Sequence, residues 1–331
     1  MRAPAFWWRA TGLASTLLGP FGAIYGAIAD RRLERPGEAA GVPVVCIGNP
    51  TLGGAGKTPT ALAVAALLAE AGERPVFLAR GYGGSLPGPV EVDPALHDFR
   101  AVGDEPLLLA RHFPTVIARD RLAGARFARD LGATVVVMDD GFQNSRLAKD
   151  FSLLVIDARR GLGNGRIFPA GPLRAGLVRQ LRKADAVLVI GQGTRAEGVE
   201  ELAISHGLPL FSARLEPDRA AVASLRGTRA LAFAGIGDPE KFFATLDAAN
   251  IAAPMRRGFP DHHAYTAAEA AELMRVAEAQ GLVPVTTEKD FMRLSAHPAL
   301  HARAQALPVS LVLDDPKGLA AAVLSAVRKT P

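Results

Sequence analysis

A glycine-rich segment between an apolar run and a helix-like run constrains the fold of this chain more than any other feature. The segment covers residues 48–59; it directly follows the apolar run Val42–Ile47 and directly precedes the helix-like run Thr60–Ala71. A turn of this kind can wrap its backbone N–H groups around phosphate oxygens, and the start of the helix adds positive potential there. The pattern therefore predicts the P-loop of a nucleotide-binding protein.

The side chains of this loop have distinct expected roles in nucleotide binding. Lys57 is expected to reach the β- and γ-phosphates, and the Thr58 hydroxyl is expected to ligate Mg²⁺. Thr51 stands where the strict P-loop pattern has its first glycine, which is a departure from that pattern. The residues expected to bind the nucleotide are Thr51, Leu52, Gly53, Gly54, Ala55, Gly56, Lys57 and Thr58.

Apolar runs and helix-like segments alternate through the rest of the chain. Strands are expected at residues 74–78, 115–118, 134–138, 153–157 and 186–190, and a second series begins near residue 226. This alternation predicts an α/β protein with a P-loop NTPase-like, mostly parallel sheet, helices on both faces and a smaller C-terminal α/β domain. The expected division is an N-terminal segment 1–30, a P-loop domain 31–225 and the smaller domain 226–331.

The N-terminal segment has an unusual composition. Residues 10–29 contain no charge, which is just enough length to span a bilayer, but Pro20 and several glycines interrupt the stretch. We interpret it as an interfacial segment with Trp7 and Trp8 at the level of the lipid headgroups and nearby arginines facing anionic phosphates. A true transmembrane span and a helix packed on the domain are the alternatives.

The charge balance limits the partners. The net charge of +5 favours an anionic partner, such as a phosphorylated substrate or an anionic membrane surface. The sequence has no lysine-rich tract and no interleaved basic and aromatic residues, so a nucleic-acid partner is not expected. No obligate protein partner is indicated. The single cysteine, Cys46, lies inside the first apolar run and is consistent with a reducing compartment.

An apolar strand that ends in two carboxylates is expected to complete the nucleotide site. Val135–Met138 precede Asp139 and Asp140, the pattern of a Walker B strand, whose carboxylate holds the Mg²⁺ that bridges the phosphates. Gln143 follows in the same loop and is either a substrate contact or a turn residue. ATP is the expected nucleotide, because Lys289 and Asp290 are adjacent and do not reproduce the spacing of a guanine-recognition motif.

Phosphoryl transfer to a hydroxyl also needs a group that accepts the hydroxyl proton. Asp104, at the start of an expected helix, and the Asp261-His262-His263 segment are the candidates. Arginines bind phosphate through two parallel hydrogen bonds and keep their charge. The side chains expected to bind substrate are Asn49, Arg80, Arg119, Gln143 and Arg174.

Taken together and in their order along the chain, these segments resemble the tetraacyldisaccharide 4′-kinase family. The segments that match are the P-loop with its Thr51, residues 80–83, 103–105, 139–143, 169–174, 261–263 and 287–290. The resemblance implies a lipid kinase that uses ATP and Mg²⁺ to phosphorylate the 4′-hydroxyl of a tetraacylated glucosamine disaccharide 1-phosphate in lipid A biosynthesis. It also implies a location at the cytoplasmic face of the bacterial inner membrane and a smaller domain that closes over ATP.

The resemblance also implies roles for individual residues. Asp104 would pair with a histidine, for which His262 matches the family pattern most directly and His263 remains the alternative. Arg174 matches a functional arginine, whereas Ala175 stands where relatives commonly have glutamate and Asn144 where many have histidine. A nucleotide-switch ATPase would share the P-loop and Asp139 but would not need Asp104, the histidines or the apolar N-terminus. A non-catalytic membrane adaptor is the second alternative.

Overall fold

A nine-stranded sheet carries the glycine-rich loop at the end of a central strand. The computed structural model describes residues 4–329. The strands of this sheet are β1 (Val44–Gly48), β2 (Pro75–Ala79), β3 (Val90–Glu91), β4 (Thr115–Ile117), β5 (Val135–Asp139), β6 (Phe151–Asp157), β7 (Ala186–Ile190), β8 (Leu210–Pro217) and β13 (Val309–Leu313). Their order is β13-β8-β7-β6-β1-β5-β2-β4-β3, and only the outermost pair at each edge is antiparallel.

Helices cover both faces of this sheet because its central strands are apolar on both sides. In β1, Val45 and Ile47 point to one face and Val44 and Cys46 to the other, as the alternation of side chains along a strand requires. Helices α3 (Lys57–Glu70), α4 (Phe99–Val102), α5 (Asp104–Ala110) and α14 (Pro316–Val327) pack on the first face. Helices α2 (Gly19–Leu33), α6 (Arg121–Asp130), α7 (Leu177–Leu181) and α8 (Glu197–Ser205) pack on the second. The expected α/β class is confirmed.

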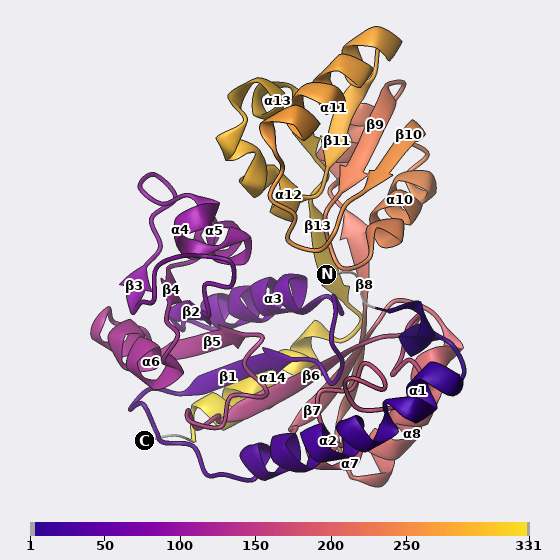
Figure 1. Cartoon of the computed structure of the whole chain (residues 1–331). Coiled ribbons are helices and arrows are strands. Elements are labelled where there is room, and N and C mark those ends of the chain that lie inside the picture. Colours follow the sequence, from indigo (N-terminus) through magenta and orange to yellow (C-terminus); the bar gives the residue numbers. More distant parts are fainter. Residues whose placement is uncertain (1–3, 330–331) are drawn as a thin grey trace.

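A four-stranded parallel sheet forms a second, smaller unit, which stands above the large sheet in Figure 1. Its strand order is β10-β9-β11-β12. Its strands are β9 (Arg229–Ala234), β10 (Ala252–Gly258), β11 (Val283–Thr286) and β12 (Gln305–Ala306). Its helices are α9 (Arg219–Leu225), α10 (Pro239–Ala248), α11 (Ala267–Gln280), α12 (Glu288–Arg293) and α13 (Pro298–Arg303), with a 3-10 turn η3 (Leu294–Ala296).

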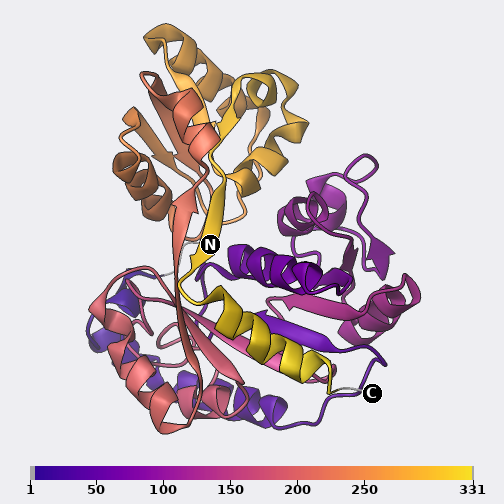
Figure 2. The same cartoon turned by 180° about the vertical axis from the view of Figure 1, so that it is seen from behind.

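The structure differs from the expected division at the C-terminus. Residues 226–331 were expected to form the smaller unit, but β13 pairs with β8 at the edge of the large sheet, and α14 packs against α3. Figure 2 shows the two long strands running side by side from the small unit down into the large one. The chain therefore enters the small unit through β8 and leaves it through β13, so two strands connect the units.

The N-terminal segment is a set of short helices rather than one long one. It consists of the 3-10 turn η1 (Ala5–Trp8), α1 (Leu13–Leu17) and α2, while residues 1–3 of the expected segment 1–30 lie outside the described part. Within residues 4–329, no helix combines the length and the apolar character that crossing a bilayer requires. Trp7 was expected at the level of the headgroups, but it is buried, and its Nε1 donates a hydrogen bond to the carbonyl of Pro169.

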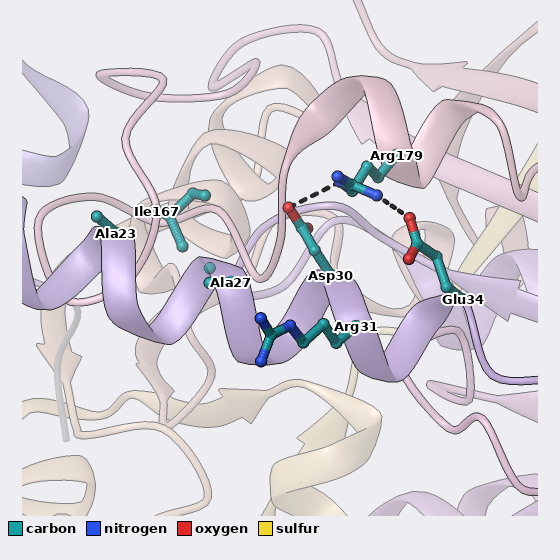
Figure 3. Close-up of a pocket in the computed structure, with 8 residues that line it drawn as sticks. Ala23, Ala27, Asp30, Arg31, Glu34, Ile167 and Arg179 are labelled. Carbon is teal, nitrogen blue, oxygen red and sulfur yellow. Dashed lines mark ion pairs between the residues drawn. The ribbon is translucent and has the colours of Figure 1, made fainter.

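One side of α2 is fixed to the large unit by charged contacts. Figure 3 shows Arg179 of α7 reaching between Asp30 of α2 and Glu34, which caps the C-terminal end of α2. The Arg179 Nε lies 3.1 Å from Asp30 Oδ2, and Asp30 Oδ1 also accepts a hydrogen bond from the backbone N–H of Gly176 at 2.9 Å. The opposite side of α2 is exposed and apolar, with Phe21 63% and Ile24 64% exposed.

Candidate active site

The glycine-rich loop has the backbone conformation of a phosphate cradle. Gly53 and Gly56 have φ of 114° and 93°, a region that strongly favours glycine, and Gly56 is the residue that precedes the first turn of α3. A Cβ atom at Gly56 would also come within 2.8 Å of Ile190 Cδ1. The loop is tied to a neighbouring segment by the hydrogen bond from Leu52 N to Pro172 O at 2.8 Å. The conformation of the loop therefore depends on glycine at these positions and on its contact with the segment that contains Pro172.

The first turn of α3 directs Lys57 and Thr58 toward the end of β5. The Thr58 hydroxyl donates to Asp139 Oδ2 at 3.0 Å. The Lys57 Nζ donates to Asn49 Oδ1 at 3.0 Å and lies 3.7 Å from Asp140 Oδ1. Asn49 in turn donates from its Nδ2 to the carbonyl of Thr51 at 2.6 Å, so it braces both the lysine and the loop.

Asp139 and Asp140 occupy different electrostatic environments although they are adjacent. Burial raises the pKa of Asp139, and the nearby charge of Glu105 adds to this effect. Burial also acts on Asp140, but the charges of Lys57 and Arg174 outweigh it and lower the pKa of Asp140 to about 2. Asp139 Oδ1 is buried without a hydrogen-bond partner among the described residues. This oxygen therefore has its hydrogen-bonding capacity unused in the described structure.

Arg174 joins the loop to the carboxylates. Its Nε donates to the carbonyl of Thr51 at 3.0 Å, its Nη1 to Gln143 Oε1 at 3.0 Å and its Nη2 to Asp140 Oδ2 at 3.2 Å. Gln143 in turn donates to the carbonyl of Asn49 at 3.3 Å. The structure therefore brings Asn49, Gln143 and Arg174, three of the residues expected to bind substrate, together at the P-loop.

The two units meet at Asp104, which begins α5. Asp104 is 4% exposed, and His262 of the small unit lies beside it with Nδ1 3.1 Å from Asp104 Oδ1. Arg293 of α12, itself 2% exposed, places its Nε 3.0 Å from Asp104 Oδ2. The neighbouring Glu105 pairs with Lys289 at 2.6 Å. Arg293 and Lys289 were not expected at this site, because they come from a helix about 185 residues further along the chain.

His262 and His263 point in different directions. The His262 side chain is 28% exposed and tilts against the ring of Tyr82, with ring centroids 5.1 Å apart. His263 stacks on Phe259 and bonds to Glu269 at 3.0 Å within the small unit. Of the two alternatives, the structure places only His262 against Asp104.

The Asp104–His262 pair shifts both pKa values in favour of the charged forms. Burial raises the pKa of Asp104, but the hydrogen bond from His262 and the charge of Arg293 outweigh it and lower the value to about 2. Burial lowers the pKa of His262, but the hydrogen bond to Asp104 and its charge outweigh this and raise the value above 6.5. The two titrations belong to the pair rather than to either residue alone.

These shifts predict a pH dependence of stability. Because the pKa of His262 is higher in the folded than in the unfolded state, its stabilising effect is complete below about 6.5, the unfolded value, and is lost as the pH rises through the folded value. We expect the Tm of the unmodified protein to exceed that of a His262→Asn variant by more at pH 6 than at pH 9. Differential scanning calorimetry of both proteins at the two pH values measures this, and an equal Tm difference would contradict it.

A turn of the small unit lies directly over the P-loop. A Cβ atom on Gly237 would lie 3.3 Å from the backbone nitrogen of Gly54. The next residue, Asp238, forms ion pairs with Arg159 and Arg160 in the loop after β6, the latter at 2.8 Å. Lys241 of α10 pairs with Asp157 at the end of β6. The small unit therefore contacts the large one on both sides of the loop.

The expected arginines are not all placed alike. Arg80 is exposed, and Arg119 is exposed and donates to the carbonyl of Ser85 at 3.3 Å. Arg121, two residues further on, is 5% exposed, and the charges of Asp140 and Asp139 act on its pKa, which burial lowers to about 10. Arg121, which the sequence also places among the basic residues around the expected cleft, is thus buried, and its Nη1 donates to the carbonyl of Ala118 at 2.6 Å.

Comparisons with known proteins agree with this geometry. A model of the family described as tetraacyldisaccharide-1-P 4′-kinase matches residues 14–328. The chain is similar to the tetraacyldisaccharide 4′-kinase of Rhodopseudomonas palustris (strain BisA53), with 56% identity over 96% of this chain and 94% of that protein. It is equally similar to the enzyme of the same name from Methylobacterium nodulans, with 56% identity over 96% of this chain and 93% of that protein.

A solved structure shares the whole fold. The crystal structure of LpxK from Aquifex aeolicus in complex with ATP superposes on this chain with a TM-score of 0.75. The two sequences are 26% identical, and the match covers 95% of this chain and all of that one.

Proposed function

The chain belongs to the tetraacyldisaccharide 4′-kinase family, and on this premise we propose how its residues transfer the γ-phosphate of ATP to the 4′-hydroxyl of a tetraacylated glucosamine disaccharide 1-phosphate in lipid A biosynthesis. The observation that carries the proposal is the contact of the buried Asp104 with the partly exposed His262, formed between the two units. A protein that only hydrolyses ATP to change shape has no use for such a pair.

The triphosphate is held by the glycine-rich loop. The backbone N–H groups of residues 53–58 and the start of α3 supply donors and positive potential for the phosphates. Lys57, which approaches Asn49 and Asp140 in the structure, supplies a positive charge for the β- and γ-phosphate oxygens. The Gly237 turn of the small unit lies close enough to Gly54 to cover the bound nucleotide.

The residues present fit a magnesium ion. Mg²⁺ in kinases is commonly bound by one or two carboxylates, a hydroxyl and the substrate phosphates, with water completing the shell. Asp139, with one buried oxygen lacking a hydrogen bond among the described residues, and the Thr58 hydroxyl next to it are the groups we assign to the ion. Asp140 completes the set. Bound Mg²⁺ would neutralise charge on the phosphate oxygens.

We assign the proton of the attacking hydroxyl to the neutral form of His262, whose Nδ1 faces Asp104 and whose Nε2 is the accepting atom. Arg293 and the N–H of Glu105 hold the Asp104 carboxylate in place, and Asp104 in turn fixes the ring of His262. Glu105, the neighbour of Asp104, and its partner Lys289 both act electrostatically on Asp139, one of the proposed magnesium carboxylates. We therefore assign the attacking hydroxyl to the space between the Asp104–His262 pair and the γ-phosphate.

Arginine side chains recognise the acceptor. Arg174 and Gln143 lie at the edge of the P-loop, and we assign them, with Asn49, to the sugar near the reacting hydroxyl. Arg80 and Arg119 are exposed beside the glycine loop after β2 and suit the 1-phosphate of the acceptor, which is a doubly charged group.

The acceptor lies in a bilayer, and the exposed side of the N-terminal helices is suited to reach it. Leu13, Leu17, Phe21, Ile24 and Ile28 form a line of apolar side chains that are 49–77% exposed, which we call the apolar stripe. Arg31 and Arg32 are exposed beyond its C-terminal end. A line of exposed apolar residues with cationic residues at its end is typical of peripheral binding to an anionic membrane. We assign the enzyme to the cytoplasmic face of the inner membrane.

Charge placed in the apolar stripe should weaken membrane binding. Burial of one large apolar side chain contributes about 1.5–3 kcal/mol, or about 10–100-fold in affinity, so the double variant Phe21→Glu, Ile24→Glu should bind vesicles at least about 100-fold more weakly. Sedimentation with vesicles of phosphatidylcholine and phosphatidylglycerol measures this. The matched control is Leu96→Glu, Leu131→Glu, which changes two exposed apolar residues elsewhere on the large unit. Equal binding of both double variants to the vesicles would contradict a role of the apolar stripe in membrane binding.

The test of the activity is the fate of the γ-phosphate. The protein is incubated with Mg-ATP and the tetraacylated disaccharide 1-phosphate in detergent micelles, and the lipid is extracted into organic solvent. Mass analysis should show one added phosphate on the lipid. Release of inorganic phosphate with no change in lipid mass would instead indicate a nucleotide-switch ATPase.

A further inference from the structure

A second pocket lies away from the P-loop, where the N-terminal segment crosses the loop after β6. Its volume is about 510 Å³. The residues that line it are Trp8, Arg9, Ala10, Thr11, Arg160, Gly163, Asn164 and Arg195. These described residues include three arginines, one indole and no carboxylate. The lining is therefore cationic and aromatic, and none of its residues belongs to the nucleotide site or to the acceptor-binding set assigned above.

The wall formed by Trp8 is held in a fixed position. The guanidinium of Arg160 lies over the Trp8 ring, with its carbon 4.7 Å from the ring centroid. Gly163 has φ of 61°, and a Cβ atom there would lie 2.3 Å from the carbonyl oxygen of Trp7 and 3.2 Å from the Trp8 ring. The backbone N–H of Asn164 donates to Trp7 O at 2.7 Å. The loop after β6 thus contacts the Trp8 indole and leaves the pocket beside it open.

Among the described residues, two of the three arginines form no ion pair with an acidic residue. Arg160 forms an ion pair with Asp238 of the small unit at 2.8 Å. Within residues 4–329, neither Arg9 nor Arg195 has a carboxylate partner, and Arg195 Nη1 donates only to the carbonyl of Trp8 at 3.3 Å. Two guanidinium groups beside an aromatic ring are suited to a phosphate group, which each can bind through parallel hydrogen bonds.

The position of the pocket indicates where that phosphate belongs. Thr11 in its wall is two residues before Leu13, the first residue of the apolar stripe and 77% exposed. A protein that rests on a bilayer through the stripe holds the pocket near the headgroup layer, where tryptophan and arginine side chains are favoured. The positive charge of the pocket and its position next to the apolar stripe both favour a phosphate group that belongs to a membrane lipid.

We propose that this pocket binds the phosphate headgroup of an anionic phospholipid and so fixes the orientation of the enzyme on the membrane. The proposal rests on the membrane placement given above, but it does not depend on the phosphoryl transfer. Its consequence is a saturable lipid site, in contrast to the diffuse attraction between an anionic bilayer and scattered arginines.

Fluorescence of Trp8 provides the test. The full-length protein is titrated with dihexanoyl-phosphatidylglycerol at concentrations where the lipid is monomeric, and a saturable change in indole emission is expected. Because Trp7 is buried, the response should disappear in Trp8→Phe. In the double variant Arg9→Gln, Arg195→Gln, half-saturation should need at least about tenfold more lipid. The matched control Arg31→Gln, Arg32→Gln, which removes the same charge at the other end of the stripe, should respond as the unmodified protein does.

Three outcomes would overturn the proposal. They are the absence of a saturable response in the unmodified protein, an equal loss in both double variants, and saturation by inorganic phosphate at the same concentration as by the lipid. The last outcome would indicate a site for free anions. Kinase activity is measured in micelles on the same samples; normal turnover by Arg9→Gln, Arg195→Gln shows that it is folded. If the protein phosphorylates the lipid but shows no saturable change in indole emission, only the phospholipid site is contradicted. If it shows that change but transfers no phosphate, only the proposed kinase activity is contradicted.

Discussion

Replacing Asp104 with asparagine is expected to lower kcat by about 10²–10⁴-fold, the range for loss of a positioned acid–base group, while Mg-ATP still binds. Asparagine has the size of aspartate and keeps one carbonyl oxygen as an acceptor for Arg293 or His262, and Arg293 retains its ion pair with Asp290 at 3.3 Å. What it removes is the negative charge that the His262–Arg293 environment stabilises. Transfer of labelled phosphate to the lipid gives kcat, and equilibrium binding of Mg-ATP gives the Kd.

The neighbouring histidines provide the controls for this prediction. His262→Asn should lower kcat to a similar degree, and the double variant with Asp104→Asn should be little worse than either single variant, because the two residues act as one unit. His263→Asn should leave kcat almost unchanged, since His263 bonds to Glu269 and stacks on Phe259 inside the small unit. Near-normal kcat in Asp104→Asn, or a damaging His263→Asn, would contradict the assignment of the pair.

The parts of the site that the sequence predicted are those made by neighbours along the chain. Lys57 and Thr58 follow a glycine loop between a buried strand and a helix, and Asp139 ends a buried strand. The carboxyl ends of parallel neighbours such as β1 and β5 meet at one edge of the sheet, so local pattern is enough to bring these side chains together.

The parts that the sequence did not predict depend on how the two units face each other. Lys289 and Arg293 reach Glu105 and Asp104 from α12, and Asp238 reaches the loop after β6 from the start of α10. Hydropathy and turn signals describe each unit separately and carry no information on the angle between them. The pairing of Asp104 with a histidine of the small unit was predicted only from the family resemblance.

The two connecting strands were misjudged for a related reason. β8 is mostly half-exposed, and its sequence mixes arginine, glutamate and serine with apolar residues, so it lacks the continuous apolar run of a central strand. β13 does have apolar residues, but its partner is β8, nearly a hundred residues earlier in the chain. The hydrophobic periodicity and strand propensity of its residues identify such a segment as a strand, but they do not identify the sheet to which it belongs.

Replacing Lys57 with methionine should lower kcat/KM by about 10²–10³-fold, the loss that follows removal of one preorganised electrostatic group at a developing charge. The Lys57 side chain is 12% exposed, and its Nζ is held by Asn49 and Asp140, so its charge is already aimed at the place where the phosphates bind. Asp140 keeps its ion pair with Arg174 at 3.1 Å in this variant, which preserves the loop. Steady-state transfer to the lipid in micelles measures the effect.

A second replacement separates charge from position. Lys57→Arg keeps the charge but carries a planar, larger head that does not fit between Asn49 and Asp140, so we expect it to recover only a small part of the loss. Lys317→Met, at an exposed position on α14, removes the same charge from the same protein and should leave kcat/KM unchanged. Lys57→Met could instead prove as active as the control Lys317→Met. The γ-phosphate would then have to be stabilised by the loop amides, Mg²⁺ and Arg174 without the lysine. That result would remove the P-loop lysine from the mechanism while leaving the nucleotide site in place.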